Sequence, residues 1–250
     1  MIIIENKLPS HLSWLCPVQA PDLTRLGDQM DGGYVVPRAV IDQADGLLSL
    51  GLGDNWSFDT AWHSLKPQDP IHLYDGSVSR DSLQITINVP VRGNLDLKSA
   101  YNTFFTGTVQ HVVQNVGPGE DQVDLVDCLN RLNGQNIFIK MDIEGGEYAL
   151  IESIIQNSSR ITGMVMEFHF CNSHRDIFQK AVTALQQEYV IVHLHGNNHV
   201  DIGAEGLTDC LELTLIRRDL CNSTQARTTC YLDGLDFSNV AGAEDHRYCF

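Results

Sequence analysis

The sequence predicts an α/β fold built on a doubly wound sheet of about seven strands, mostly parallel with the last strand antiparallel, and covered by helices on both faces. Apolar runs with strand character recur along the 250 residues, and amphipathic helical stretches separate several of them. The last two runs are joined by the loop 196–209, which suits an antiparallel pair. The runs are 46–52, 70–75, 109–117, 136–142, 161–170, 189–195 and 210–218.

Three stretches between these runs carry apolar residues at helical spacing. They are residues 123–133, 146–157 and 174–188. Because the apolar positions recur every three to four residues, each stretch is expected to bury one stripe against the sheet. The expected stripes are Val123, Val126 and Leu129 or Asn130; Tyr148, Ile151, Ile154 and Ile155; and Ile177, Phe178, Val182 and Leu185.

The chain divides into three parts on composition. Residues 1–45 form a lead-in that is expected to cover the substrate or cofactor, and within it Asp31-Gly32-Gly33 predicts a tight turn before a short extended run stopped by Pro37. Residues 46–220 form the main domain. Residues 221–250 are polar and irregular, so they are expected to form a tail packed on that domain.

The charge balance excludes some partners. With 16 Lys and Arg against 32 Asp and Glu, the net charge is −16, which disfavours nucleic acid and anionic membrane surfaces. The N-terminus lacks a basic region and a long apolar stretch, and no apolar run approaches the ~20 residues that span a bilayer. A cytoplasmic protein is therefore expected.

The seven cysteines contain no C-x-x-C pair and are interpreted as free thiols, with a disulfide among Cys221, Cys230 and Cys249 left open.

The first strand runs into a glycine loop that indicates a nucleotide-type cofactor. Gly51 and Gly53 break the strand, and Asp75 ends the next one about twenty residues on, where a carboxylate can accept hydrogen bonds from ribose hydroxyls. The alternative is a plain turn with a surface Asp. A dinucleotide site needs a third glycine, but Trp56 occupies that position and would crowd a pyrophosphate. S-adenosylmethionine has no phosphates and carries cationic groups that suit an acidic site.

A second group of chemically active residues lies at the ends of later strands. Strand alternation puts Lys140 and Asp142 on one face. It does the same for Glu167 with His169 and for His193 with His195. We expect the three strands that carry these residues to be adjacent, so that they bring carboxylates and imidazoles to one edge of the sheet. Packing alone does not explain such a cluster.

Each of these residues also has a structural interpretation. Asp142 could cap the following turn. Glu144 and Glu147 are expected to serve the turn and the helix start, where the dipole stabilises negative charge by ~0.3–1 kcal/mol. Lys140 is either a buried partner for a carboxylate or a general base. His193, further inside its strand, is expected to be a satisfied core histidine.

At these positions the sequence resembles the FkbM-type class I methyltransferases. The matching segments are "DGGYVV", "SLGLGDNWSFD", "FIKMDIEGGEYALIESI", "MEFH", "HLHGNNH" and "LDFSNVAGAED", which together span roughly residues 25–245. The resemblance implies a Rossmann-like sheet, S-adenosylmethionine as methyl donor, and transfer to a hydroxyl of a sugar, a glycoside or a related small metabolite. The cofactor positions that match are Gly51, Gly53, Asp54, Asn55, Ser57 and Asp75.

Two versions of the chemistry stay open. In one, Asp142, Glu167 and His169 hold Mg²⁺, which lowers the pKa of the acceptor hydroxyl, and His169 or His195 is the base. In the other, no metal takes part and Asp142 orients a histidine. The candidate catalytic residues are thus Asp142, His169, His195 and Lys140. The rival functions are an NAD(P)-dependent oxidoreductase and a non-catalytic carbohydrate-binding relative. The acceptor and the oligomeric state, a homodimer included, are left open.

Overall fold

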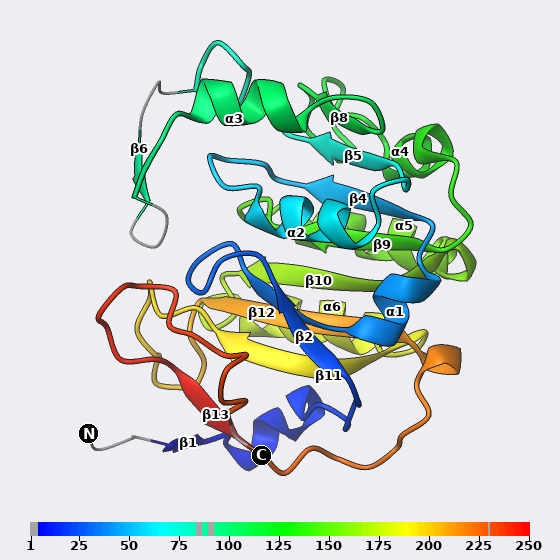
Figure 1. The fold of residues 1–250 in the computed structure, drawn as a ribbon. Helices are drawn as coiled ribbons and strands as arrows, with labels where there is room; N and C mark the ends of the chain where they lie inside the picture. The colour runs from blue at the N-terminus through cyan, green and yellow to red at the C-terminus, as the bar shows by residue number, and fades with distance from the viewer. Residues whose placement is uncertain (1–4, 84–86, 90–92, 230) are drawn as a thin grey trace.

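A seven-stranded sheet forms the centre of the computed structural model, which describes residues 5–83, 87–89, 93–229 and 231–250. Its strand order is β11-β12-β10-β9-β4-β5-β8 (Figure 1). The strands are β4 (Gly46–Leu50), β5 (Ile71–Tyr74), β8 (Val109–Val112), β9 (Ile137–Met141), β10 (Ile161–His169), β11 (Tyr189–Gly196) and β12 (Cys210–Arg217). In this sheet β12 runs antiparallel to both of its neighbours, β10 and β11, and the other strand pairs are parallel. The predicted fold class and the antiparallel final pair are confirmed.

One expectation about this sheet is wrong. The strands carrying Asp142, Glu167 and His195 are not three adjacent strands, because β12 turns back and inserts between β10 and β11. The loop 196–209 is long enough to let the chain reverse and pair on the inner side of β11, where both edges of β12 find partners. His195 therefore lies two strands away from His169.

Helices cover both faces of the sheet (Figure 1). On one face lie α1 (Arg38–Gln43) and α2 (Ser57–Leu65), and on the other lie α4 (Leu125–Leu132), α5 (Ile151–Gln156) and α6 (Arg175–Leu185). Two buried apolar clusters correspond to these two layers. The remaining helices are α3 (Leu97–Phe104) at the β8 edge and the short 3₁₀ turns η1 (Ser10–Leu15), η2 (Glu147–Leu150), η3 (Ser158–Arg160) and η4 (Arg218–Leu220).

The helix α4 shows how its sequence sets its ends and its buried face. The Asp124 side chain accepts a hydrogen bond from the Val126 amide at the start, and Asn133 ends the helix in the left-handed conformation. The buried residues are Leu125, Cys128, Leu129 and Leu132, so the predicted stripe was wrong at Val126, which is 36% exposed. The α6 stripe was wrong at Ile177, which is 52% exposed. The buried face of α4 is rotated by about one residue from the expected one, whereas α6 buries the rest of its expected stripe and adds Ala181.

The segment predicted as one helix over 146–157 begins as the 3₁₀ turn η2 and becomes α-helical only at Ile151. At its start the Oε1 of Glu147 accepts from the amides of Ile143 and Gly145 and so holds the preceding turn. This carboxylate serves the turn, as the sequence suggests.

The lead-in and the tail both pack on the sheet. β2 (Leu23–Leu26) and β3 (Tyr34–Pro37) form an antiparallel pair across the Asp31-Gly32-Gly33 turn. Arg25 donates from Nη1 to the Leu235 carbonyl of the tail at 3.0 Å. At the chain ends, β1 (Glu5–Lys7) pairs in parallel with β13 (Arg247–Cys249) (Figure 1). A further pair joins β6 (Ile87–Val89) to β7 (Gly93–Leu95).

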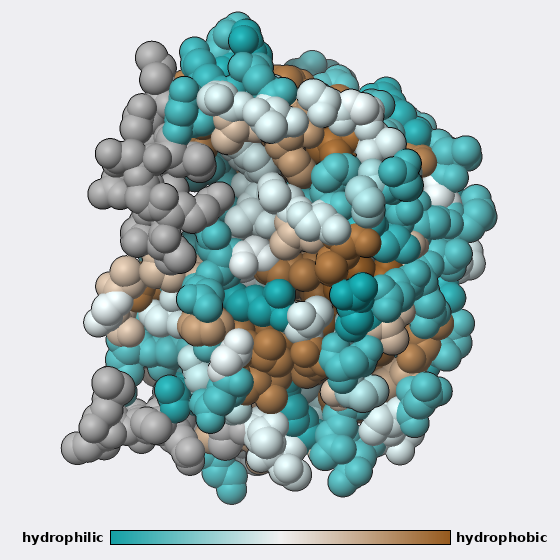
Figure 2. Space-filling model, in the orientation of Figure 1, coloured by the Kyte–Doolittle hydropathy of each residue, from teal (hydrophilic) through white to brown (hydrophobic). Residues whose placement is uncertain are grey.

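The structure also bears on three features considered from the sequence, namely membrane-spanning segments, the polar surface and the cysteines. No helix among the described residues is long and apolar enough to cross a membrane. Hydrophilic residues cover most of the face shown in Figure 2, and hydrophobic residues gather near its middle. Cys16, Cys128, Cys171, Cys210 and Cys221 are free, whereas Cys249 is disulfide-bonded and Cys230 lies outside the described residues.

We expect Gly51→Ala to destabilise the fold far more than Gly53→Ala. Both glycines have positive φ, +86° and +52°, but a Cβ on Gly51 would lie 1.7 Å from the Asp142 carbonyl oxygen, while a Cβ on Gly53 meets nothing within 4 Å. Overpacking should cost Gly51→Ala about 3 kcal/mol or more, against about 1 kcal/mol of left-handed strain at Gly53. Urea unfolding of both variants measures this difference, and equal losses would contradict it.

Candidate functional site

A cavity of about 270 Å³ opens where β4, β5 and β9 end. From β4 the chain builds outward through β5 and β8 on one side, and from β9 through β10 on the other, so the cavity lies where the strand order reverses. Open α/β sheets bind ligands at this position. The lining residues are Leu50, Gly51, Tyr74, Asp75, Ser77, Asn115, Val116, Gln122, Asp142, Ile143, Glu144 and Gly146.

Asp75 organises the glycine loop on one side of this cavity. Its Oδ2 accepts from the amides of Leu52 and Gly53 at 2.9 and 3.0 Å, and its Oδ1 accepts from the amide and hydroxyl of Ser77. Burial favours the neutral carboxyl, but these hydrogen bonds outweigh it and hold the pKa of Asp75 below its ordinary value. The ribose contact predicted for Asp75 stays a prediction.

Other predicted cofactor residues lie around the loop rather than in the cavity lining. Asp54 is exposed, Asn55 donates from Nδ2 to the Asp31 carbonyl at 2.9 Å, and Ser57 donates from Oγ to the Gly32 carbonyl at 3.2 Å. Asn55 and Ser57 thus attach the lead-in turn to the loop. The sequence did not single out Asn115, Val116 and Gln122, which lie after β8, because nothing in that stretch has a recognisable motif.

Lys140 is buried in β9 and supports the same loop. Its side chain donates from Nζ to the Gly51 carbonyl at 2.6 Å, and the residue is 5% exposed. This hydrogen bond fixes the backbone of Gly51, which lines the cavity, while Lys140 is not among the lining residues. A direct catalytic role for Lys140 stays a prediction.

Asp142 and His169 face one another at the ends of β9 and β10. The Asp142 side chain is 30% exposed, and its Oδ1 lies 3.9 Å from His169 Nε2. The other ring nitrogen, Nδ1, lies 2.9 Å from Oε1 of the fully buried Glu147. The exposed Glu144 brings its Oε2 to 3.4 Å from Nε2. The imidazole is therefore oriented by one carboxylate and presents its second nitrogen to three others, the third being Glu167 at 4.0 Å.

The titration of His169 reflects these neighbours. Burial alone lowers the pKa of an imidazole, but the hydrogen bond to Glu147 and the charges of Glu147, Glu167 and Asp142 outweigh burial and raise the pKa of His169 to about 9. In the absence of a bound cation, the ring is thus a positive counterion for a strongly acidic pocket.

Glu167 points from β10 into the same region and is only 5% exposed. Its Oε2 accepts from the Tyr34 hydroxyl at 3.2 Å, and its Oε1 accepts from Asn197 Nδ2 at 3.0 Å and from the Cys210 thiol at 2.7 Å. Burial, together with the charges of Asp142 and Glu212, raises the pKa of Glu167 to about 8.

His195 has a different environment from His169. It is 4% exposed, its Nε2 lies 3.1 Å from Asp245 Oδ1, and its Nδ1 lies 3.3 Å from Glu212 Oε2. Burial lowers the pKa of this imidazole, but Glu212 and Asp245 raise it to about 10. His193 is a core histidine, as the sequence predicts, with Nε2 2.8 Å from Asp236 Oδ1. Both rings tie β11 to the tail.

Sequence reasoning missed two residues that the structure brings to this edge. Phe170 follows β10 with φ +62°, is 47% exposed, and its ring lies against Gly145. A bulky residue in the left-handed region is uncommon and marks a constrained loop. Cys210 opens β12 directly opposite His169. No local motif identifies either residue, because strand register and loop packing bring them here.

Two groups of side chains have metal-ligand spacing among the described residues, namely Asp142 with Glu144 and His169, and Glu167 with His169 and Cys210. In each group the candidate ligand atoms lie within 4.8 Å of one another. Neither group contains both Asp142 and Glu167, which the sequence combines with His169. The predicted magnesium ligand set therefore stays a prediction.

No family model and no curated protein matches this chain. Among solved structures, a Methanococcus jannaschii fibrillarin pre-rRNA processing protein shares 11% identity over 71% of this chain and 68% of its own, with a TM-score of 0.41. The 23S rRNA methyltransferase ErmE shares 9% identity over 75% and 67%, with a TM-score of 0.38. An O-methyltransferase family protein from Burkholderia thailandensis shares 12% identity over 71% and 52%, with a TM-score of 0.37.

We expect His195→Gln to destabilise the fold in a pH-dependent way. The pKa of His195 is about 10 in the fold against an ordinary 6.5, so its contribution is complete below pH 6.5 and is lost as the pH rises toward 10. Leaving Glu212 and Asp245 without their cation should cost about 3–5 kcal/mol at pH 6 and less at pH 9.5. Urea unfolding at both pH values tests this.

His11→Gln is the matched control for that series. His11 lies 3.7 Å from Glu205 with its side chain 47% exposed, so its replacement should change stability by no more than about 0.5 kcal/mol. A His195 variant as stable as this control, or a loss that grows with pH, would contradict the structural role of His195.

Proposed function

We propose that this chain is an S-adenosylmethionine-dependent O-methyltransferase of the FkbM type, acting on a hydroxyl of a sugar, a glycoside or a related small metabolite. The observation that carries the proposal is the cavity at the strand-order reversal, with Asp75 on one side and Asp142 on the other. Its described lining contains three carboxylates, those of Asp75, Asp142 and Glu144, and no Lys or Arg. Such a lining favours a ligand with sulfonium and ammonium groups over one with phosphates.

Trp56 supports the choice of this cofactor over a dinucleotide. Its indole is 6% exposed and packs edge-on against Tyr101 and Phe105, with ring centroids 6.2 and 5.7 Å away. Trp56 is also the N-cap residue of α2. A pyrophosphate would need close backbone approach at this helix start, and the third glycine that permits it is missing.

The acidic edge beside the cavity would bind and deprotonate the acceptor. S-adenosylmethionine supplies the methyl group when it is bound, and this chain must align the acceptor oxygen and accept its proton. We assign the base role to the neutral form of His169, which predominates only above its raised pKa of about 9. In that form Glu147 holds the proton on Nδ1 and leaves Nε2, which faces Asp142, free to accept a proton. His195, held between Glu212 and Asp245, is the alternative. The exposed ring of Phe170 offers an apolar surface for a sugar or aglycone.

The proposal allows two versions of the chemistry, one with a bound Mg²⁺ and one without. Asp142 and Glu167 supply the oxygen ligands that Mg²⁺ prefers, and His169 lies between them, with Nε2 3.9 Å from Asp142 Oδ1 and 4.0 Å from Glu167 Oε1. An ion held by these residues would lower the pKa of the acceptor hydroxyl. In the metal-free version Asp142 orients the acceptor or the histidine.

The cytoplasmic location stays a prediction, and the disulfide at Cys249 counts against it because disulfides are rare in a reducing compartment.

We expect Asp142→Asn and Asp75→Ala to separate chemistry from cofactor binding. Asp142→Asn should reduce methyl transfer to a panel of glycosides at least 100-fold and leave S-adenosylhomocysteine affinity within about threefold. Asp75→Ala should weaken that affinity at least tenfold, because it removes the carboxylate that holds Leu52 and Gly53. Calorimetric titration and single-turnover assays measure both effects.

The same titration separates the rival functions. Wild-type protein that binds NAD(H) or NADP(H) and not S-adenosylhomocysteine would support an oxidoreductase and overturn the proposal. Protein that binds a glycoside of the panel but transfers no methyl group would support a non-catalytic carbohydrate-binding relative.

The metal branch predicts that turnover falls in EDTA and returns on addition of Mg²⁺. A chelator removes the ion that lowers the pKa of the acceptor hydroxyl, so activity should drop at least tenfold. Unchanged turnover in EDTA would leave the metal-free version. The S-adenosylhomocysteine affinity, measured in the same buffer, shows whether the protein itself is intact.

A further inference from the structure

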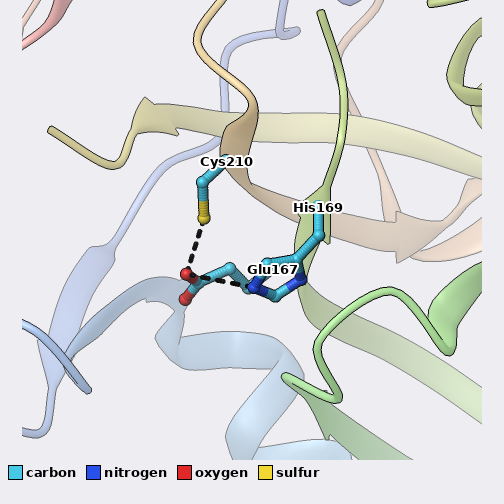
Figure 3. A group of neighbouring side chains, drawn as sticks. All are labelled: Glu167, His169 and Cys210. Atoms are coloured by element: carbon cyan, nitrogen blue, oxygen red, sulfur yellow. Dashed lines mark hydrogen bonds and ion pairs between the residues drawn. The ribbon is translucent and has the colours of Figure 1, made fainter. Parts of the chain in front are cut away.

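Three potential metal ligands converge from two neighbouring strands (Figure 3). Glu167 and His169 come from β10, and Cys210 opens β12 directly opposite His169. The Cys210 thiol lies 2.7 Å from Glu167 Oε1, and the same oxygen lies 4.0 Å from His169 Nε2. Glu167 and Cys210 are 5% and 6% exposed, so the group is largely shielded from water.

The orientation of His169 is a second, independent indication of a metal site. Glu147, which is fully buried, holds Nδ1 at 2.9 Å, so a neutral ring carries its proton there. The lone pair of Nε2 is then free on the side of Glu144, Asp142 and Glu167, which lie 3.4, 3.9 and 4.0 Å from it. Metal-binding histidines show this arrangement, in which a second carboxylate fixes the tautomer and raises the basicity of the ligating nitrogen.

The Glu167 carboxylate has no permanently charged partner among the described residues. Asp142 and Glu212 both act on it electrostatically, and among the described residues no lysine or arginine forms an ion pair with Glu167. Its direct partners are neutral donors from Tyr34, Asn197 and Cys210, together with the titratable His169. A divalent ion would compensate the desolvated carboxylates directly.

We propose that Glu167, His169 and Cys210 bind a thiophilic divalent ion, Zn²⁺ in the first instance. A thiolate with an imidazole and a carboxylate is a donor set for Zn²⁺ and not for Mg²⁺, which takes oxygen ligands. Binding replaces the Cys210 thiol proton with the ion and releases that proton to solvent. Three protein ligands leave a fourth position free, as in catalytic zinc sites. Asp142, 3.9 Å from His169 Nε2, borders the site. An ion on Nε2 occupies the nitrogen that the His169 base role and the Mg²⁺ set both require, so in the zinc-bound protein His195 would be the base.

The test is a titration of the chelator-stripped full-length protein with Co²⁺, which is a spectroscopic substitute for Zn²⁺. We expect one equivalent to bind with a thiolate-to-cobalt charge-transfer band, and Zn²⁺ to abolish the band while a hundredfold excess of Mg²⁺ does not. Cys210→Ser should lose the band. Cys221→Ser, which replaces another free cysteine at a half-buried position in the tail, should keep it.

A second variant keeps the test decisive if Cys210→Ser fails to fold. Glu147→Gln leaves all three ligands in place, so it should keep the band and weaken Co²⁺ binding about 10–100-fold. A wild-type protein without the band, a band that survives in Cys210→Ser, or displacement by Mg²⁺ overturns the thiophilic site. S-adenosylhomocysteine binding in the same samples reports on the proposed function separately, because ion binding does not depend on methyl transfer.

Discussion

The desolvation of carboxylates at the ends of β9, β10 and β12 is the constraint on which much of this structure depends. Buried negative charges must find donors or cations, since each costs several kcal/mol without them. The donors come from distant parts of the chain: Tyr34 of the lead-in and Asn197 of the loop 196–209 serve Glu167, and Asn239 of the tail serves Glu212 at 2.7 Å. The lead-in, the loop and the tail therefore fold over this edge of the sheet for an electrostatic reason as well as an apolar one.

The same desolvation constraint gives the two aspartates beside the cavity different roles. Asp75 is saturated by four hydrogen-bond donors and works as a fixed anchor for the glycine loop. Asp142 keeps its side chain 30% exposed. Its backbone is held by Leu50, because the Asp142 amide donates to the Leu50 carbonyl at 2.9 Å. An anchored carboxylate shapes the pocket, whereas a rigidly placed and solvent-facing one can contact a ligand.

Strand alternation predicted correctly that Asp142, Glu167 and His169 meet, because β9 and β10 are neighbours and both end at the same edge. The same reasoning failed for His195. Alternation gives the face of a side chain but not the order of the strands, and β12 separates β11 from β10. Glu147 was predicted to serve the turn, which it does, yet its contact with His169 spans 22 residues and no local pattern predicts it.

The sequence by itself determined the seven strands, the glycine loop with Asp75, and the acidic end of β9, because each depends on local periodicity or on a short motif. Only the tertiary structure decided which strands are neighbours, that Cys210 lies opposite His169, and that Phe170 stands exposed beside Gly145. These relations come from strand register and loop packing. They join residues far apart in the chain, where the free energy of pairing is a property of the whole sheet and not of any one segment.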